Sequence, residues 1–269
     1  MSGRGLGTGS THGTRQFDNK VKRAIPSVFH MIAGAEDAQQ SQEAYNISKF
    51  ELPNPAGKAG GVCTSALLQV WYQNPHSFGE MTWMELLKEM GSILKEMKYD
   101  QVPQLSSSRL INVHSDPMYI APPGSGRRRA VLIGINYVGQ KGELTACQTD
   151  CLNVAEYLTT VQGFDPLEIL ILMDDDEHTP PTKQNIINAF ELLTKYSQPG
   201  DVAFLSYSGH GGRVVDTSGD EKDGYDETII PVDFMESGQI VDDDILEIFV
   251  KPMRKGVTTT VLIDCCHSG

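Results

Sequence analysis

The fold of this chain is decided by its last nine residues, Val261-Leu262-Ile263-Asp264-Cys265-Cys266-His267-Ser268-Gly269. An apolar, β-branched run ends abruptly in an acid, two thiols, an imidazole and a glycine. The run predicts a strand over 258–263 that is buried on both faces, as central parallel strands are. The polar residues would then lie at the carboxyl end of that strand, where open α/β sheets place their active sites.

A second stretch has the same design. Residues 202–207 (VAFLSY) predict another buried strand, and Ser208-Gly209-His210-Gly211-Gly212 follows it. A thiol has a pKa of about 8.5, so it needs a base or a cation beside it to attack as a thiolate. The two strand ends therefore predict a Cys–His nucleophilic site. Taken singly, His210 could belong to a Gly-rich turn and Cys266 could be a buried core thiol.

The two adjacent thiols are separated by the alternation of side chains along a strand. Asp264 and Cys266 should share one face, and Ile263 and Cys265 the other. If Ile263 points into the core, Cys265 follows it, which leaves Asp264 and Cys266 on the side of the active site. Cys266 is therefore the expected nucleophile.

The composition is that of an ordinary globular protein. The chain has 269 residues, 39% of them hydrophobic, which allows one large domain or two small ones. A net charge of −13 disfavours nucleic acid and anionic membranes as partners. The acidity favours basic peptides and divalent cations, or simply keeps the protein soluble. The five cysteines, with no apolar leader or spanning run, favour a reducing compartment, so we expect a cytoplasmic monomer.

The order of patterns along the chain predicts an α/β protein. We expect a disordered tail over 1–22, a first region over 23–113, a Pro/Gly-rich linker over 114–129 and a second region over 130–269. Alternating strands and helices in the second region predict a mostly parallel sheet with helices on both faces. The expected strands are 28–32, 109–113, 130–136, 167–173, 202–207 and 258–263. One helix is expected to begin at residue 64, and four others are expected over 82–97, 145–160, 182–196 and 243–249. Residues 104–108 are expected to form a loop.

Taken together, the motifs resemble a known family. S-G-H-G-G, then G-D-E-K-D-G-Y-D-E-T-I-I-P-V-D, then D-C-C-H-S-G are similar to the large-subunit region of metacaspases, which are caspase-like cysteine peptidases. The resemblance covers roughly 129–269. It implies a caspase-like fold and a catalytic dyad of His210 and Cys266, with the N–H groups of Gly211 and Cys266 holding the oxyanion. The family usually has Ser where this chain has Cys265, a neighbouring thiol able to form or exchange a disulfide.

The first region resembles the same family in an unusual place. Residues 36–43 (EDAQQSQE) and 104–108 (QLSSS) look like pieces of its small subunit, which normally follows the large one. Here they precede it, which is the order of the type III metacaspases known from algae. The resemblance thus makes 23–113 a small-subunit-like region that the linker joins to the large-subunit-like region.

The resemblance also implies a substrate preference, because metacaspases cleave after Arg or Lys. A buried cationic side chain needs carboxylates in its pocket. Asp264 lies on the expected face, Asp150 in A-C-Q-T-D-C matches the second pocket acid of the family, and Ser208 is a further pocket residue. For Asp150, a solvated helix acid is the alternative. Basic residues at which the protein could cleave itself are Arg129, Lys251 and Arg254.

Acidic residues are concentrated between 220 and 244. Calcium takes several oxygen ligands and tolerates irregular geometry, although the spacing does not fit an EF-hand loop. The resemblance implies calcium activation with Asp226, Asp242 and Asp243 as ligands. Otherwise the stretch is a solvated acidic loop with a helix cap.

Two hypotheses about function follow. The first is a calcium-activated cysteine endopeptidase that cleaves after Arg or Lys. The second is a non-catalytic caspase-like module that senses redox state or binds metal through Cys265 and Cys266. Cys147 and Cys151, four residues apart on a predicted helix, could hold zinc together with those two thiols and His267, but no second knuckle supports such a site.

Overall fold

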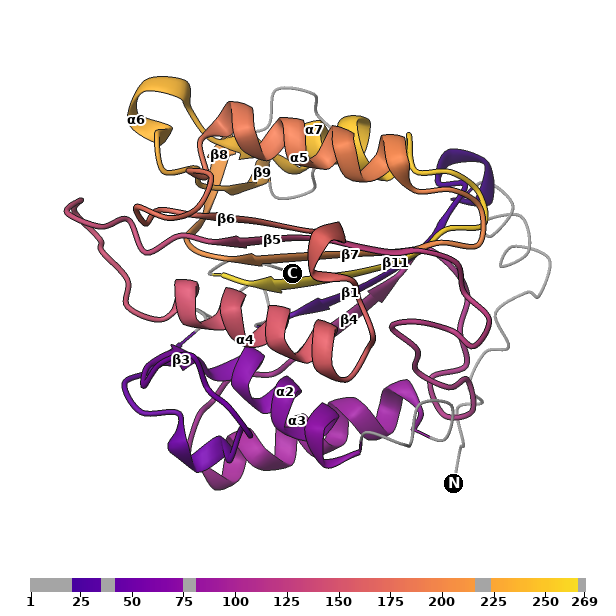
Figure 1. Cartoon of the computed structure of the whole chain (residues 1–269), viewed down its shortest axis with the longest axis horizontal. Coiled ribbons are helices and arrows are strands. Elements are labelled where there is room, and N and C mark those ends of the chain that lie inside the picture. Colours follow the sequence, from indigo (N-terminus) through magenta and orange to yellow (C-terminus); the bar gives the residue numbers. More distant parts are fainter. Residues whose placement is uncertain (1–20, 35–41, 75–80, 216–223, 266–269) are drawn as a thin grey trace, which may run out of the picture.

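The computed structural model describes residues 21–34, 42–74, 81–215 and 224–265. In this part of the chain, one mostly parallel sheet lies between two layers of helices, as the sequence predicted (Figure 1). The predicted tail lies almost entirely outside the described residues, as do Cys266 and His267. The elements are β1 Val28–Ala33, β2 Glu43–Ala44, η1 Ser48–Phe50, β3 Gly60–Gly61, α2 Val62–Gln73, α3 Trp83–Glu96, β4 Gln104–Ser107, β5 Arg128–Gly134, α4 Cys147–Thr160, η2 Pro166–Glu168, β6 Ile169–Met173, α5 Lys183–Tyr196, β7 Val202–Ser208, β8 Gly211–Val215, β9 Tyr225–Ile229, α6 Phe234–Ser237, β10 Ile240–Val241, α7 Asp242–Ile245, η3 Leu246–Val250 and β11 Thr258–Asp264.

The two strands singled out in the sequence are neighbours in the sheet. Its order is β4-β1-β11-β7-β5-β6, and every pair is parallel except β4 with β1. β7 is buried along its whole length, and β11 is buried from Thr259 to Leu262. The register pairs Asp264 with Ser208, so the strand that carries the acid and the strand that leads to His210 end side by side.

Helices cover both faces of the sheet (Figure 1). α2, α3 and α4 lie on one face, and α5, α7 and η3 lie on the other. Because side chains alternate along β11, its residues contribute to two hydrophobic cores, one on each face of the sheet. Leu262 packs in the first core, with residues of α2, α3 and α4, whereas Val261 packs in the second core, with residues of α5 and η3. In the first core, Trp71 of α2 stacks on Tyr157 of α4 with 5.0 Å between ring centroids, and this contact joins the two halves of the chain.

Two helices begin where their cap residues predict. Thr82 accepts a hydrogen bond from the N–H of Glu85, and the Glu85 carboxylate accepts one from the N–H of Thr82, which is a complete capping box for α3. The Thr182 side chain accepts a hydrogen bond from the N–H of Asn185 and begins α5. The predicted spans 82–97 and 182–196 are confirmed to within a residue.

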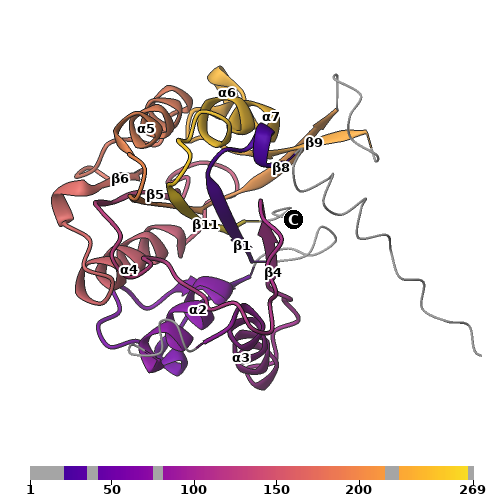
Figure 2. The same ribbon diagram turned by 90° about the vertical axis from the view of Figure 1, so that its right-hand side faces the viewer.

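The first region of the chain adds the edge of the same sheet. β1 pairs with β11 from Val28 opposite Thr258 to Ala33 opposite Ile263, and β4 pairs with β1. Figure 2 shows β1 and β4 continuing the sheet beyond β11. The two regions of the chain therefore share one sheet, and the predicted linker runs between its strands.

One strand prediction was wrong. The edge strand is β4, Gln104–Ser107, and residues 109–113 are not a strand. The guanidinium of Arg109 donates hydrogen bonds to the backbone carbonyls of Ile25, Pro26 and Ser27, so the chain turns away from the edge directly after β4. The polar run QLSS was read as a loop because no residue of β4 is fully buried, so the strand carries no apolar alternation.

We expect Gly134→Ala to destabilise the protein. A Cβ at Gly134, the last residue of β5, would lie 2.5 Å from the backbone carbonyl oxygen of Cys147 and 2.9 Å from the Cβ of Cys151. The start of α4 would have to move, at a cost of about 1–3 kcal/mol in the free energy of unfolding. Gly91→Ala in α3 is the control, because no atom lies within 4 Å of its added Cβ. Urea unfolding of both variants checks this, and an unchanged midpoint for Gly134→Ala would contradict it.

None of the helices in the described ranges is both long and apolar enough to cross a membrane.

Candidate active site

A small cavity lies at the carboxyl ends of β7 and β11. Its volume is about 60 Å³, and its lining includes His210, Asp150, Ser208 and Asp264. The structure thus brings together the predicted base and the predicted pocket residues. The cavity would hold about two water molecules, so a long basic side chain enters only if the lining residues move apart.

The His210 side chain is oriented by a backbone carbonyl. Its Nε2 lies 2.7 Å from the carbonyl oxygen of Gly142. A carbonyl oxygen only accepts hydrogen bonds, so Nε2 carries the proton and Nδ1 of the neutral ring is the acceptor. This tautomer leaves Nδ1 able to take a proton from a neighbouring thiol.

Two buried tyrosines hold the backbone of the loop that carries His210. The N–H of His210 donates to the hydroxyl oxygen of Tyr137 at 2.9 Å, and the Tyr207 hydroxyl donates to the His210 carbonyl at 2.7 Å. Burial raises the pKa of both phenols, so both remain hydroxyl groups near neutral pH. Tyr137 has a backbone φ of 54°, a conformation that costs energy for a non-glycine residue and that the surrounding hydrogen bonds offset.

The two predicted pocket acids form a buried pair. Asp150 is 2% exposed and Asp264 is 5% exposed. The N–H of Gly61 lies 2.8 Å from each carboxylate oxygen of Asp150, and the Ser208 hydroxyl donates to Asp150 at 3.1 Å. Burial, and then the charge of Asp264, raise the pKa of Asp150 well above its ordinary range. A solvated helix acid is therefore excluded for Asp150.

The cysteines around the acid pair are held as neutral thiols. Burial is the largest cause of the raised pKa of Cys63, Cys147 and Cys151, and the charge of Asp150 raises each of them further. Zinc binds thiolates, so this environment disfavours the zinc site considered above. Among the residues that the structure describes, no group of three or more His, Cys, Asp or Glu side chains could hold a metal ion.

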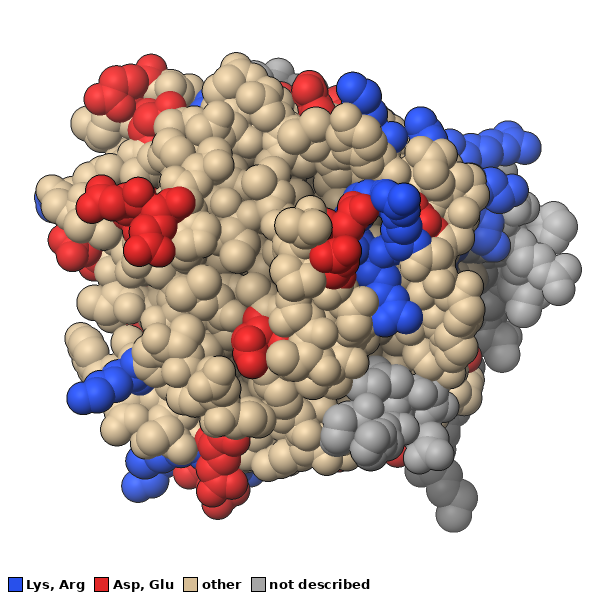
Figure 3. Space-filling view, in the orientation of Figure 1, with Lys and Arg blue, Asp and Glu red and all other residues tan. Residues whose placement is uncertain are grey.

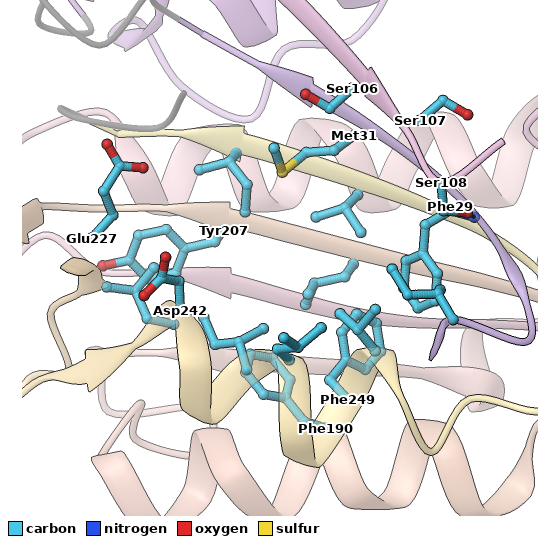
Figure 4. Close-up of a pocket in the computed structure, with 18 of the residues that line it drawn as sticks. Phe29, Met31, Ser106, Ser107, Ser108, Phe190, Tyr207, Glu227, Asp242 and Phe249 are labelled. Carbon is cyan, nitrogen blue, oxygen red and sulfur yellow. Dashed lines mark hydrogen bonds between the residues drawn. The ribbon is translucent and has the colours of Figure 1, made fainter. Parts of the chain in front are cut away.

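Cys265 lies on the opposite face of β11 from Asp264, as the alternation predicted. It is 2% exposed and packs in the same core as Val261. It lines an apolar cavity of about 690 Å³ between the sheet and η3 (Figure 4), and it also borders the small cavity that contains His210. Figure 4 shows Phe190 and Phe249 on the helical side of this cavity. Cys266, the predicted nucleophile, lies outside the described residues.

The three predicted calcium ligands lie on neighbouring elements. Asp226 is a buried residue of β9, and Asp242 and Asp243 begin α7, which contacts β9. Side chains alternate on β9, so Asp226 and Glu227 face opposite ways, and Figure 4 shows Glu227 with Asp242 at one end of the apolar cavity. Within the described residues the three carboxylates do not form a complete metal site, and no catalytic step is derived through calcium.

The three predicted cleavage sites differ in accessibility. Arg129 lies within β5 and forms ion pairs of 2.8 Å with Glu168 and with Asp201, so it is not the exposed site that its sequence context suggested. Lys251 and Arg254 follow η3 and are exposed. A peptidase could reach them without opening the sheet.

Several residues of the site escaped the sequence analysis. They come from the first half of the chain or from the loop before α4. Glu43 accepts a hydrogen bond from the N–H of Ala146 beside the start of α4, across about a hundred residues of sequence. The only local sequence feature that could have indicated that the first region contributes to the site is the pair Gly60-Gly61, which directly precedes a helical pattern. The others are Gly142, Tyr137 and Thr64.

The family model and the curated relatives agree on one family. The family description "Metacaspase, peptidase C14 domain" matches residues 128–269. Metacaspase III c of Phaeodactylum tricornutum is 46% identical over 258 residues, which cover 94% of this chain and 76% of that protein. Metacaspase-1A of Aspergillus fumigatus is 50% identical over 148 residues, which cover 54% of this chain but only 36% of that protein. A solved structure from Geobacter sulfurreducens matches 54% of this chain and 52% of its own, at 35% identity and a TM-score of 0.44.

Proposed function

Because the chain belongs to the metacaspase family of peptidases, we propose that it is an endopeptidase that cleaves after Arg or Lys with a dyad of Cys266 and His210. Membership in this family makes it a cysteine peptidase with protein substrates. The observation that carries the preference for basic residues is the buried pair Asp150 and Asp264, which lies in one cavity with His210. In the proposed arrangement, the substrate's basic side chain enters that cavity.

The proposed reaction is acyl transfer to a thiol. Nδ1 of His210 takes the proton of the Cys266 thiol, and the thiolate attacks the scissile carbonyl. The N–H groups of Gly211 and Cys266 stabilise the oxyanion. The imidazolium then returns its proton to the leaving amine, and water, deprotonated by the same ring, hydrolyses the thioester. The Gly142 carbonyl supports this role because it keeps the proton on Nε2.

The preference for basic residues is assigned to the pocket rather than to the outer surface. Charged residues of both signs are scattered over the face in Figure 3, and much of that face carries neither. A neutral side chain at the cleavage site would leave the carboxylates buried and uncompensated, which is how sites built for a charged group reject other substrates. A coumarin peptide with Arg before the scissile bond should therefore be cleaved, and the same peptide with Asp should not. Equal rates would contradict the preference for basic residues, and no cleavage of either peptide would favour the non-catalytic module.

Calcium activation remains part of the proposal. Its support is the resemblance to the family, which implies Asp226, Asp242 and Asp243 as ligands; in the described part of the chain these carboxylates do not by themselves form a metal site. We expect activity to rise with the concentration of free calcium. In Asp243→Asn, the calcium concentration that gives half of the full activity should rise by about tenfold or more. Removing a group that only orients a metal ligand already weakens metal binding by about that factor. Asp244→Asn is the matched control, because Asp244 is an exposed neighbour outside the proposed ligand set. Calorimetric titration with calcium gives a second readout, and activity that ignores both calcium and a chelator would contradict the proposal.

We also propose a cytoplasmic monomer that cleaves itself at Lys251 or Arg254. The four described cysteines form no disulfide, which fits a reducing compartment. The exposure of the two basic residues supports the choice of cleavage sites.

A further inference from the structure

The acid pair is held by the first turn of a helix from the opposite half of the chain. The N–H and the hydroxyl of Thr64 lie 3.0 Å and 2.7 Å from the same oxygen, Oδ2, of Asp264, and both donate to it. Thr64 is itself buried, with 1% of its surface exposed. Three residues earlier, Gly61 donates its N–H to Asp150. One short segment therefore touches both carboxylates.

The two carboxylates crowd around Gly61. A Cβ at this position would lie 2.5 Å from Oδ2 of Asp150 and 2.5 Å from Oδ2 of Asp264. The two oxygens are thus separated by no more than twice that distance. Two carboxylates so close repel each other when both are charged, and a buried pair of this kind holds one proton in common.

Each acid accepts hydrogen bonds from two donor groups, Asp150 from the N–H of Gly61 and the hydroxyl of Ser208, and Asp264 from the N–H and the hydroxyl of Thr64. Asp264 receives two donors from Thr64 on one oxygen, and hydrogen bonds to a carboxylate favour its charged form. Burial and the charge of Asp264 raise the pKa of Asp150 well above its ordinary range, so Asp150 binds a proton readily in the folded protein. The other titratable groups that border the pair are Glu43 of β2, Cys63 of α2, Cys147 of α4, His210 after β7 and Cys265 after β11.

We propose that Thr64 is a positioning residue of the specificity pocket, whose two hydrogen bonds keep Asp264 charged and aimed at the substrate's basic side chain. This inference rests on the proposed function and extends it, because it makes recognition depend on the first half of the chain. The pocket is complete only when the start of α2 lies against β11 and α4. A basic side chain that enters then replaces the proton shared by the pair.

The test separates the hydroxyl of Thr64 from its volume. Thr64→Val keeps the shape of the side chain but removes the hydroxyl, whereas Thr64→Ser keeps the hydroxyl. If the valine variant proves unstable, Thr64→Ala removes the hydroxyl without adding a group that could clash with the neighbouring residues. Ser65→Ala is the control, because Ser65 is buried in the same turn and has no hydrogen bond to either acid in the described structure. The probe is agmatine, which carries the guanidinium of arginine, and its dissociation constant is measured by calorimetry from pH 5 to pH 9.

We expect Thr64→Val to bind agmatine about tenfold more weakly at neutral pH, the usual loss for a hydrogen bond to a charged group. Its affinity should recover at higher pH, because Asp264 without this donor holds a proton to a higher pH. KM for an arginine peptide should rise while kcat changes little. Thr64→Ser and Ser65→Ala should match the natural protein in affinity and in pH profile.

The outcomes distinguish this inference from the proposed function. If the natural protein binds agmatine but never cleaves arginine peptides, the proposed function is wrong and the role of Thr64 is still decided by the binding data. If Thr64→Val keeps the affinity and pH profile of the natural protein, the inference is wrong. Equal loss in Thr64→Val and Thr64→Ser would also overturn it, because it would show that packing and not the hydroxyl matters. If the natural protein cleaves arginine peptides but fails to bind agmatine, the inference is overturned and the proposed function stands.

Discussion

Cys266→Ala should abolish cleavage of arginine peptides, whereas Cys265→Ser should keep most of it. We expect kcat to fall by about 10⁴-fold or more in Cys266→Ala, as when the nucleophile of a serine peptidase is removed. We expect that Cys265 does not take over the attack, because it is buried in the core with Val261, although it also borders the cavity that contains His210. The measurement is steady-state hydrolysis of an arginine coumarin peptide by both variants.

Cys265→Ser should instead lose stability. The substitution places a hydroxyl in an apolar core, which costs about 1–3 kcal/mol when the group finds no partner. Cys265→Ala avoids the buried hydroxyl. It is the control for activity, because it has lost one thiol, as Cys266→Ala has. Retained activity in Cys266→Ala together with lost activity in Cys265→Ser would show that the two thiols have been assigned the wrong way round.

Asp150→Asn should lose activity toward arginine peptides and gain stability. Removing the charge leaves the basic side chain in a buried site with only part of its compensation, so we expect kcat/KM to fall by about 10²-fold or more. The amide keeps the shape of the carboxylate and can still accept the hydrogen bond of Gly61. It also ends the repulsion with Asp264. Asp264→Asn should cause a similar loss of activity.

The gain in stability should depend on pH. The folded protein raises the pKa of Asp150, so the carboxyl binds a proton more tightly when folded than when unfolded. Its contribution to stability is therefore greatest in acid, below its ordinary pKa. That contribution is lost as the pH rises toward the raised folded value. Urea unfolding at pH 5 and pH 8 should show Asp150→Asn gaining on the natural protein as the pH rises. A constant difference, or full cleavage by the variant, would contradict the buried pair.

Much of the fold follows from local patterns. The strand over 258–263, the capped helices and the alternation that separates Asp264 from Cys265 were predicted because burial on a period of two or 3.6 residues leaves its mark on neighbouring residues. The edge strand β4 was missed because none of its residues is fully buried, so its sequence lacks the alternation. The order of small- and large-subunit-like regions, which resembles type III metacaspases, remains a prediction.

The parts of the site that were missed depend on contacts between distant segments. The hydrogen bond from Thr64 to Asp264 spans 200 residues, and the one from Gly61 to Asp150 spans 89. No spacing rule connects such positions. The carbonyl of Gly142 carries no side-chain signal at all, because a backbone group that orients an imidazole can belong to any residue. Sequence motifs therefore predicted the reacting groups, whereas the fold shows the groups that surround His210 and the two acids.

The most direct measurement labels the nucleophile. A thiol-reactive peptide with arginine at its cleavage position is added to the natural protein and to Asp150→Asn, and the labelled residue is mapped by mass spectrometry. We expect one label per chain, on Cys266, and slower labelling of Asp150→Asn. The same reagent with aspartate in place of arginine should not react. A label on Cys265, or equal labelling by the arginine and aspartate reagents, would contradict this expectation.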